Sequence, residues 1–149
     1  MRKKKAIKQR KPRVIKGGIA TGSSPAAKRS RKRAIVRRLK PLQGSTVRNI
    51  AMNKDVYITA NGVKETAFHG SRTELSTIAA LDAKRQLRSA RPVAKIKAKK
   101  NGMQKAMHLV TMTKMKNSIA GHPTKVNVGN TGSGYTVLYS ITAKRRKGK

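Results

Sequence analysis

The sequence is poor in acidic residues and has no cysteine and no tryptophan. Its acidic side chains are Asp55, Glu65, Glu74 and Asp82, each separated from the next by eight or more positions. Two-metal phosphoryl transfer needs several convergent carboxylates and paired-carboxylate catalysis needs two, so both classes are disfavoured. The lack of cysteine excludes disulfides, thiolate metal sites and a cysteine nucleophile. No apolar run reaches the roughly 18 residues of a membrane span, and no short apolar segment follows the basic start as in a secretory signal. We therefore expect no metal, no cofactor and no membrane partner.

Positive charge, by contrast, is abundant and uneven. The chain has 38 Lys and Arg against 4 acids, a net charge of +34. Seventeen of these cations fall within residues 1–40, where there is no acid, and five more within 144–149. Such a chain repels itself, and a polyanion relieves the repulsion. We expect nucleic acid as this partner, with RNA favoured over DNA. Binding should go mainly to phosphates, with weak sequence specificity and strong salt dependence.

Charge and turn residues divide the chain into four parts. Residues 1–40 form a basic arm, disordered or extended over its first 26 residues and helix-prone over 27–40, where Pro41 stops the helix. Residues 41–53 are a linker, 54–143 a folded domain and 144–149 a basic tail. A nuclear-localisation signal would resemble the run KRSRKR within the arm. Membrane binding by the arm is disfavoured, because its helix-prone part lacks Trp and Phe and has a narrow apolar face.

Hydrophobic alternation and turn residues predict an α+β fold for the domain. Residues 56–60 and 63–68 read as a hairpin around Asn61-Gly62. Ser71 and Glu74 fit a capping box for the main helix, which ends at Arg91-Pro92. Strands follow at 94–98, 107–115, 125–128 and 135–142, with turns at 101–102, 121–123 and 129–134. The expected architecture is one main helix on an antiparallel sheet of four or five strands, in the order hairpin, helix, meander.

Three segments then carry a resemblance: ITANGVKETAFHG, LRSARPVA and KAMHLVTMTKMKNSIAGHPTKVNVGNTGSGYTVLYSITA. They are similar to small domains in the large polyvalent proteins of phages and conjugative elements, which resemble the barnase–EndoU–colicin–RelE group of ribonuclease folds. The resemblance covers residues 54–143 and implies an α+β fold and metal-independent RNA cleavage. This chain has Lys125 where family members carry an arginine, and Tyr139-Ser140 without the Asp-His that many have there.

Metal-free RNA cleavage needs a base for the substrate 2′-OH, an acid for the leaving oxygen and cations around the phosphate. Imidazole is the usual acid/base group near neutral pH. The candidate catalytic residues are His69, Lys64, His108, Tyr135 and Ser140. Several of them have a structural alternative, for example His108 as a half-buried strand residue and Lys64 as an exposed strand lysine. His122 fits a turn better than a site.

The expected nucleic-acid contacts lie in the arm, the tail and the exposed faces of the domain. They are Arg2, Lys3, Lys4, Lys5, Arg10, Lys11, Arg13, Lys28, Arg29, Arg31, Lys32, Arg33, Arg37, Arg38, Lys40, Arg72, Lys95, Lys97, Lys99, Lys125, Lys144, Arg145, Arg146 and Lys147. Base stacking is not expected, because alternation puts Tyr135 and Tyr139 on one face with Val137 and Ile141 and so predicts core positions.

Two functions remain open at this stage. The first is a non-catalytic nucleic-acid-binding protein of a ribosomal or phage type. The second is a ribonuclease effector or toxin of a phage or mobile element, which would need an acidic immunity protein as a further partner. Either function places the protein inside the cell, in cytoplasm or nucleoid, or within a virion or ribonucleoprotein particle.

Overall fold

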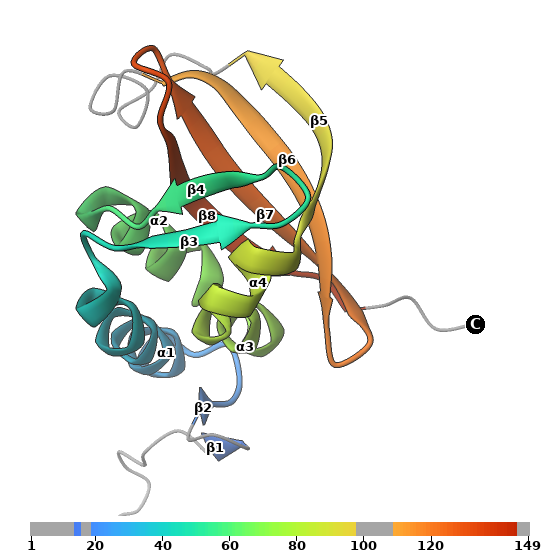
Figure 1. The fold of residues 1–149 in the computed structure, drawn as a ribbon. Helices are drawn as coiled ribbons and strands as arrows, with labels where there is room; N and C mark the ends of the chain where they lie inside the picture. The colour runs from blue at the N-terminus through green and yellow to red at the C-terminus, as the bar shows by residue number, and fades with distance from the viewer. Residues whose placement is uncertain (1–13, 16–18, 98–108, 146–149) are drawn as a thin grey trace, which may run out of the picture.

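A computed structural model describes residues 14–15, 19–97 and 109–145, and it has the predicted α+β character (Figure 1). The predicted turn at 101–102, His108 and the arm up to residue 13 lie outside the described residues. The described elements, in chain order, are β1 Val14–Ile15, β2 Ile19–Ala20, α1 Pro25–Leu39, the 3-10 turn η1 Lys40–Leu42, β3 Thr46–Asn49, β4 Lys54–Tyr57, α2 Ala60–Gly70, α3 Glu74–Leu81, α4 Ala83–Ser89, β5 Arg91–Lys97, β6 Leu109–Ile119, β7 His122–Thr131 and β8 Thr136–Ala143.

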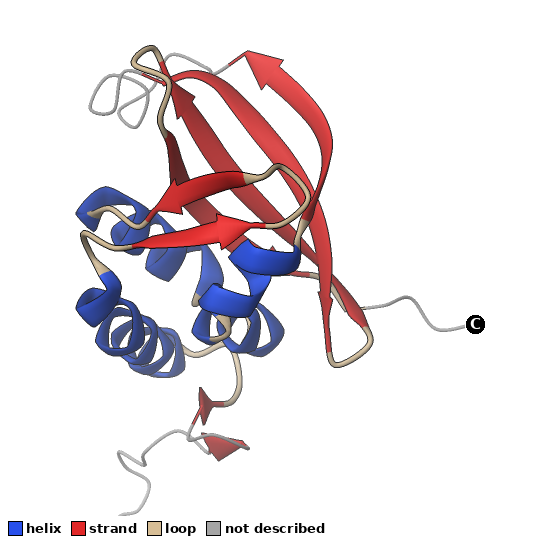
Figure 2. Ribbon diagram, viewed as in Figure 1, coloured by secondary structure: helices blue, strands red, loops and turns tan. Residues whose placement is uncertain are grey.

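The main sheet has six strands in the order β3-β4-β8-β7-β6-β5 and is mixed rather than antiparallel. The parallel contact joins β4 to β8 through Val56–Thr136 and Tyr57–Val137. The C-terminal strands do form the expected meander, β5 to β8. The prediction of four or five antiparallel strands is wrong because β3 lies in the supposed linker, and the β3–β4 hairpin adds to the open side of β8. The sheet curls, so that this hairpin passes in front of β7 and β8 (Figure 2).

The predicted return strand at 63–68 is wrong: residues Ala60–Gly70 form helix α2. Asn61-Gly62 lies in the first helical turn, where the Thr59 hydroxyl caps the helix by accepting from the Gly62 amide at 3.0 Å. α2 runs along β8 at very close range. A Cβ on Gly62 would collide with the Leu138 carbonyl oxygen, and the Thr66 hydroxyl donates to the Tyr139 carbonyl at 3.5 Å. Glycine therefore serves here for close packing and not for a turn.

The predicted single helix after Ser71 is two short helices, α3 and α4, separated at Asp82. Ser71 does not cap it but ends α2, and the N-cap is Thr73, whose hydroxyl accepts from the Ser76 amide at 3.1 Å. The end of α4 before Pro92 agrees with the prediction. The shift of the cap by two residues places Glu74 at the first helical position rather than the third.

The described residues 19–53 pack with the domain, although residues 1–40 were expected to be an arm and 41–53 a linker. Helix α1 begins two residues before the helix-prone range predicted at 27–40, and its Ile35 and Leu39 are buried in the main core. Arg31, predicted to bind nucleic acid, is fully buried. Its guanidinium donates to the carbonyls of Ala20, Gly22 and Ser71 at 2.7–2.9 Å and ties the chain before α1 to the end of α2.

The sheet has two unlike faces. The inner face packs on the helices through residues such as Met115, Val126, Val128, Leu138 and Ile141. Residues that alternate with these form the outer face. Tyr139 is an unpaired bulge residue in β8, because Ser140 pairs with Asn127 and Leu138 with Val128. The bulge shifts the inward–outward alternation of β8 by one residue. As a result Val137, Tyr139 and Thr142 all lie on the outer face, and Ile141 turns inward.

Candidate nucleic-acid interface

A row of cations crosses the outer face of the sheet at one end. Arg91 pairs with Lys116, Lys116 with Lys125 and Lys125 with Thr142, so one line of the ladder carries three adjacent positive side chains. Neighbouring strands are about 4.8 Å apart, and like charges directly opposite one another destabilise a sheet. The next line on the same face adds Lys114, which pairs with Asn127. This end of the outer face is the cationic end.

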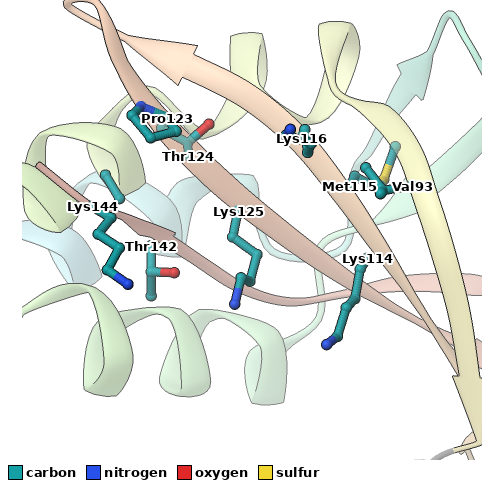
Figure 3. Close-up of a pocket in the computed structure, with 10 residues that line it drawn as sticks. Val93, Lys114, Met115, Lys116, Pro123, Thr124, Lys125, Thr142 and Lys144 are labelled. Atoms are coloured by element: carbon teal, nitrogen blue, oxygen red, sulfur yellow. The ribbon is translucent and has the colours of Figure 1, made fainter. Parts of the chain in front are cut away.

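A groove of about 540 Å³ lies at the cationic end. Its lining includes Lys114, Lys116, Lys125, Thr142 and Lys144. Figure 3 shows the side chains of Lys114, Lys125 and Lys144 extending in the same direction, with Thr142 between the last two. Within the described residues, the four lysine side chains make no hydrogen bond or ion pair, so their ammonium groups are available to an outside anion.

The acidic residues of the chain are all engaged elsewhere. Asp55 pairs with Arg48 at 3.0 Å and Asp82 with Arg85 at 2.6 Å. Glu74 accepts from the Gly22 amide at 2.7 Å, next to buried Arg31. The carboxylate of Glu65 lies 3.4 Å from Nε2 of His69 on α2. All four acidic side chains lie among the described residues, and none of them is left to neutralise the cationic end.

His69, the best of the predicted catalytic residues, lies beside the outer face. It is half-buried at the end of α2, with its ring centroid 6.0 Å from that of Tyr139 and 5.1 Å from that of Phe68. Burial raises the pKa of the Tyr139 hydroxyl, and the Glu65 carboxylate raises it further. Glu65, His69 and Tyr139 thus form a small polar cluster where α2 meets β8. Glu65 and Tyr139 were not among the predicted catalytic residues.

The structure does not gather the other predicted catalytic residues around His69. Lys64 is exposed and, at about 100° per residue, lies roughly 140° around α2 from His69. Tyr135 stands at the opposite end of β8. Ser140 is buried on the outer face, where its hydroxyl accepts from Nδ2 of Asn127 at 3.3 Å. The buried Oδ1 of that Asn127 has no hydrogen-bond partner within the described structure.

The predicted nucleic-acid contacts fall into several groups. Lys125 and Lys144 lie at the cationic end, and Arg145 follows them, exposed. Lys95 and Lys97 are exposed on β5 but pair with Thr113 and Thr111, on the line of the inner face. Exposed cations on α1 lie on a helix that packs on α2 and α3, away from β5 to β7 (Figure 1). They are Lys28, Arg29, Lys32, Arg33, Arg37 and Arg38, with Lys40 just after the helix.

Three further cations of the domain are Arg72, Lys114 and Lys116. Arg72, a predicted contact, stacks on Phe68, with its guanidinium carbon 5.0 Å from the ring centroid. Lys114 and Lys116 were not predicted, although they alternate with Thr113 and Met115 and this period could have placed them on one face. Predicted contacts outside the described residues are Arg2, Lys3, Lys4, Lys5, Arg10, Lys11, Arg13, Lys99, Arg146 and Lys147.

Two tyrosines, Tyr57 and Tyr135, meet at the other end of the outer face, so the core position predicted for Tyr135 is wrong, whereas Tyr139 is half-buried against the small apolar cluster of Leu109 and Val137. Tyr57 and Tyr135 meet edge to face with ring centroids 5.3 Å apart, and they are 36% and 54% exposed. A hollow of about 290 Å³ beside them is lined by Arg48, Asn53 and Asp55, among others. The main core contains no aromatic side chain among the described residues.

Comparison with known proteins gives no relative from which to argue. The chain matches no family model, no curated protein and no solved structure. In the part of the chain that the structure describes, none of the helices combines the length and apolar character needed to cross a membrane.

Proposed function

We propose that this protein binds nucleic acid through the phosphate backbone, with RNA preferred, and that the cationic end of the outer face is the folded part of the binding surface. The observation that carries the proposal is the line Arg91–Lys116–Lys125, three cations side by side in a sheet without a neutralising carboxylate. Such a line is unfavourable in the free protein and becomes favourable when phosphates lie across it. Basic segments at both ends of the chain add to the same attraction.

The first test removes three charges from the cationic end. The variant Lys114→Gln/Lys116→Gln/Lys125→Gln is compared with Lys32→Gln/Lys64→Gln/Lys84→Gln, which removes three exposed lysines from helices. Affinity for a labelled single-stranded RNA is measured over a range of salt concentrations. Each phosphate contact contributes about 0.7 to the slope of log K against log salt, so the first variant should lose about 2 from the slope.

The control variant should keep the slope of the wild-type protein within about 0.7. Equal losses in the two variants would mean that net charge alone drives binding and would refute a defined surface. Repeating the titration with duplex DNA and with duplex RNA tests the preference for RNA.

A second candidate function is metal-independent RNA cleavage, favoured by the Glu65–His69–Tyr139 cluster beside Ser140 on the outer face. In such a reaction the 2′-OH loses its proton to a base, its oxygen attacks the adjacent phosphorus, and the 5′-oxygen leaves with a proton from an acid. His69 is the candidate proton-transfer group, and lysines of the cationic end would stabilise the charged phosphorane. Lys64 has no part in this version, because it faces another side of α2.

Cleavage is tested by incubating the protein with labelled RNA in EDTA. The expected result is 2′,3′-cyclic phosphate ends in wild type and in the control Lys64→Ala, and none in His69→Ala. Intact RNA in all three samples, with a shifted band on a native gel, would leave binding as the function and remove cleavage.

A further inference from the structure

The outer face has a second end that phosphate binding does not explain. All three tyrosines of the chain lie on this face, Tyr57 on β4 and Tyr135 and Tyr139 on or beside β8. Aromatic side chains usually fill cores, yet this core does without them. Tyr135 is more than half exposed, and Tyr57 keeps about a third of its surface exposed.

From these positions we infer that Tyr57 and Tyr135 form a stacking site for an unpaired nucleobase, so that the ligand of the outer face is single-stranded nucleic acid. This inference rests on the proposed function and names its substrate class. The hollow beside the tyrosines, about 290 Å³, has room for one planar base and not for a duplex. Stacking on an aromatic ring accepts any base, which agrees with weak sequence specificity.

The two ends of the outer face differ in charge, as the phosphates and the bases of a single-stranded nucleic acid require. The carboxylate of Asp55 and the amide of Asn53 hold the Arg48 guanidinium at 3.0 and 2.8 Å, so Asp55 neutralises the charge of Arg48 and leaves Lys54 as the one unneutralised cation among the residues that line the hollow. A phosphate therefore gains less at the tyrosine end than at the cationic end, where four lysines line the groove. Carboxylate and amide oxygens can instead accept from the amino groups of a base.

The distance between the two ends of the outer face, and the apolar surface between them, also suit an extended single-stranded nucleic acid. Tyr135 directly precedes β8 and Thr142 lies seven residues further along, a distance of roughly 23 Å at about 3.3 Å per residue. Between them the outer face carries a small apolar cluster of Leu109, Val137, Met112 and Tyr139. A strand whose phosphates rest on the lysines can pass over this cluster and place a base on Tyr135.

The test compares two oligonucleotides of equal length and charge, one with normal bases and one abasic at every position. The chain has no tryptophan, so its fluorescence comes chiefly from three tyrosines, two of which form the proposed stacking site. We expect the normal single strand to quench this emission and to bind more tightly than the abasic strand. Tyr135→Leu, which keeps apolar bulk, should weaken binding of the normal strand about 5- to 100-fold and leave the abasic strand unchanged.

Tyr57→Phe/Tyr135→Phe keeps both rings and should bind the normal strand like wild type. Equal affinity for the two oligonucleotides, with no effect of Tyr135→Leu, would overturn the stacking site and leave phosphate binding intact. If neither oligonucleotide binds with a salt-dependent affinity, the proposed function fails first and the stacking site fails with it.

Discussion

At the scale of single residues, Arg31 is the clearest case of a cation whose role is structural. Its burial lowers the pKa of the guanidinium, an effect that the nearby Glu74 carboxylate partly offsets. The side chain replaces water with carbonyl oxygens from two separate segments. A basic residue in a run of basic residues gives no sign of this from the sequence.

Replacing Arg31 by methionine should destabilise the protein by about 2–4 kcal/mol, because two buried carbonyls and one partly buried carbonyl lose their donor. The matched variant Arg33→Met, at an exposed position of the same helix, should change stability by less than about 0.5 kcal/mol. Urea unfolding followed by circular dichroism measures both. Equal and small losses would show that the Arg31 contacts contribute little.

Tyr139 gives a prediction for alkaline pH. Its pKa is raised from 10.0, chiefly by burial and then by Glu65, so the folded state holds the phenol proton more tightly than the unfolded chain does. This contribution to stability is complete below about pH 10 and is lost as pH rises through the raised pKa. Ultraviolet titration should show a tyrosine step above the ordinary range that is absent in Tyr139→Phe. A titration curve that loses no such step in this variant would contradict the assignment.

At the scale of elements, α2 depends on close packing against β8. Gly62→Ala should cost about 2 kcal/mol or more, because the added methyl group meets the Leu138 backbone, which cannot shift without disturbing the sheet. Gly132→Ala is the matched control, since a Cβ there has only an ordinary contact at 3.6 Å with Val110. Thermal unfolding of both variants decides whether the close approach matters, and equal midpoints would show that it does not.

The line of cations across β5, β6 and β7 should lower the stability of the free protein, although the same cations favour phosphate binding. Lys116→Gln separates Arg91 from Lys125 and should raise the unfolding midpoint of the free protein by about 1–3 °C at low salt. The gain should vanish near 1 M salt, where screening acts over about 3 Å. Lys95→Gln, opposite Thr113, is the control and should give no such gain. A Lys116→Gln protein that is less stable at low salt would refute the repulsion.

At the scale of the whole molecule, the net charge of +34 should make stability depend strongly on ions. Repulsion among the cations reaches about 30 Å at 0.01 M salt and is largely screened at 1 M. The unfolding midpoint should therefore rise by several degrees between these conditions. A short RNA at low salt should have the same effect at micromolar concentration, because it binds the folded form. A midpoint that falls with added RNA would mean that the unfolded chain is the better ligand.

Much of the architecture follows from local signals. The α+β class, helix α1 and the strands of the meander were all predictable, because period and turn residues act over a few positions. The errors fall where distant residues compete with a local signal. Asn61-Gly62 is a good hairpin turn in isolation, yet Thr59 caps a helix there and β8 offers a surface on which that helix packs. The supposed linker became β3 because β4 supplied a partner.

For the candidate site too, some features follow from the sequence and others only from the tertiary structure. Charge, the scarcity of acids and the absence of cysteine are properties of the sequence itself, and they point to a polyanion without any structure. Only the tertiary structure decided which cations meet, because strand register aligns Arg91, Lys116 and Lys125 across a long separation in the chain. It also decided the place of the tyrosines, since the bulge at Tyr139 turns Ile141 inward while the outer face leaves Tyr135 exposed. A bulge depends on the pairing of two strands, and no period within one strand reveals it.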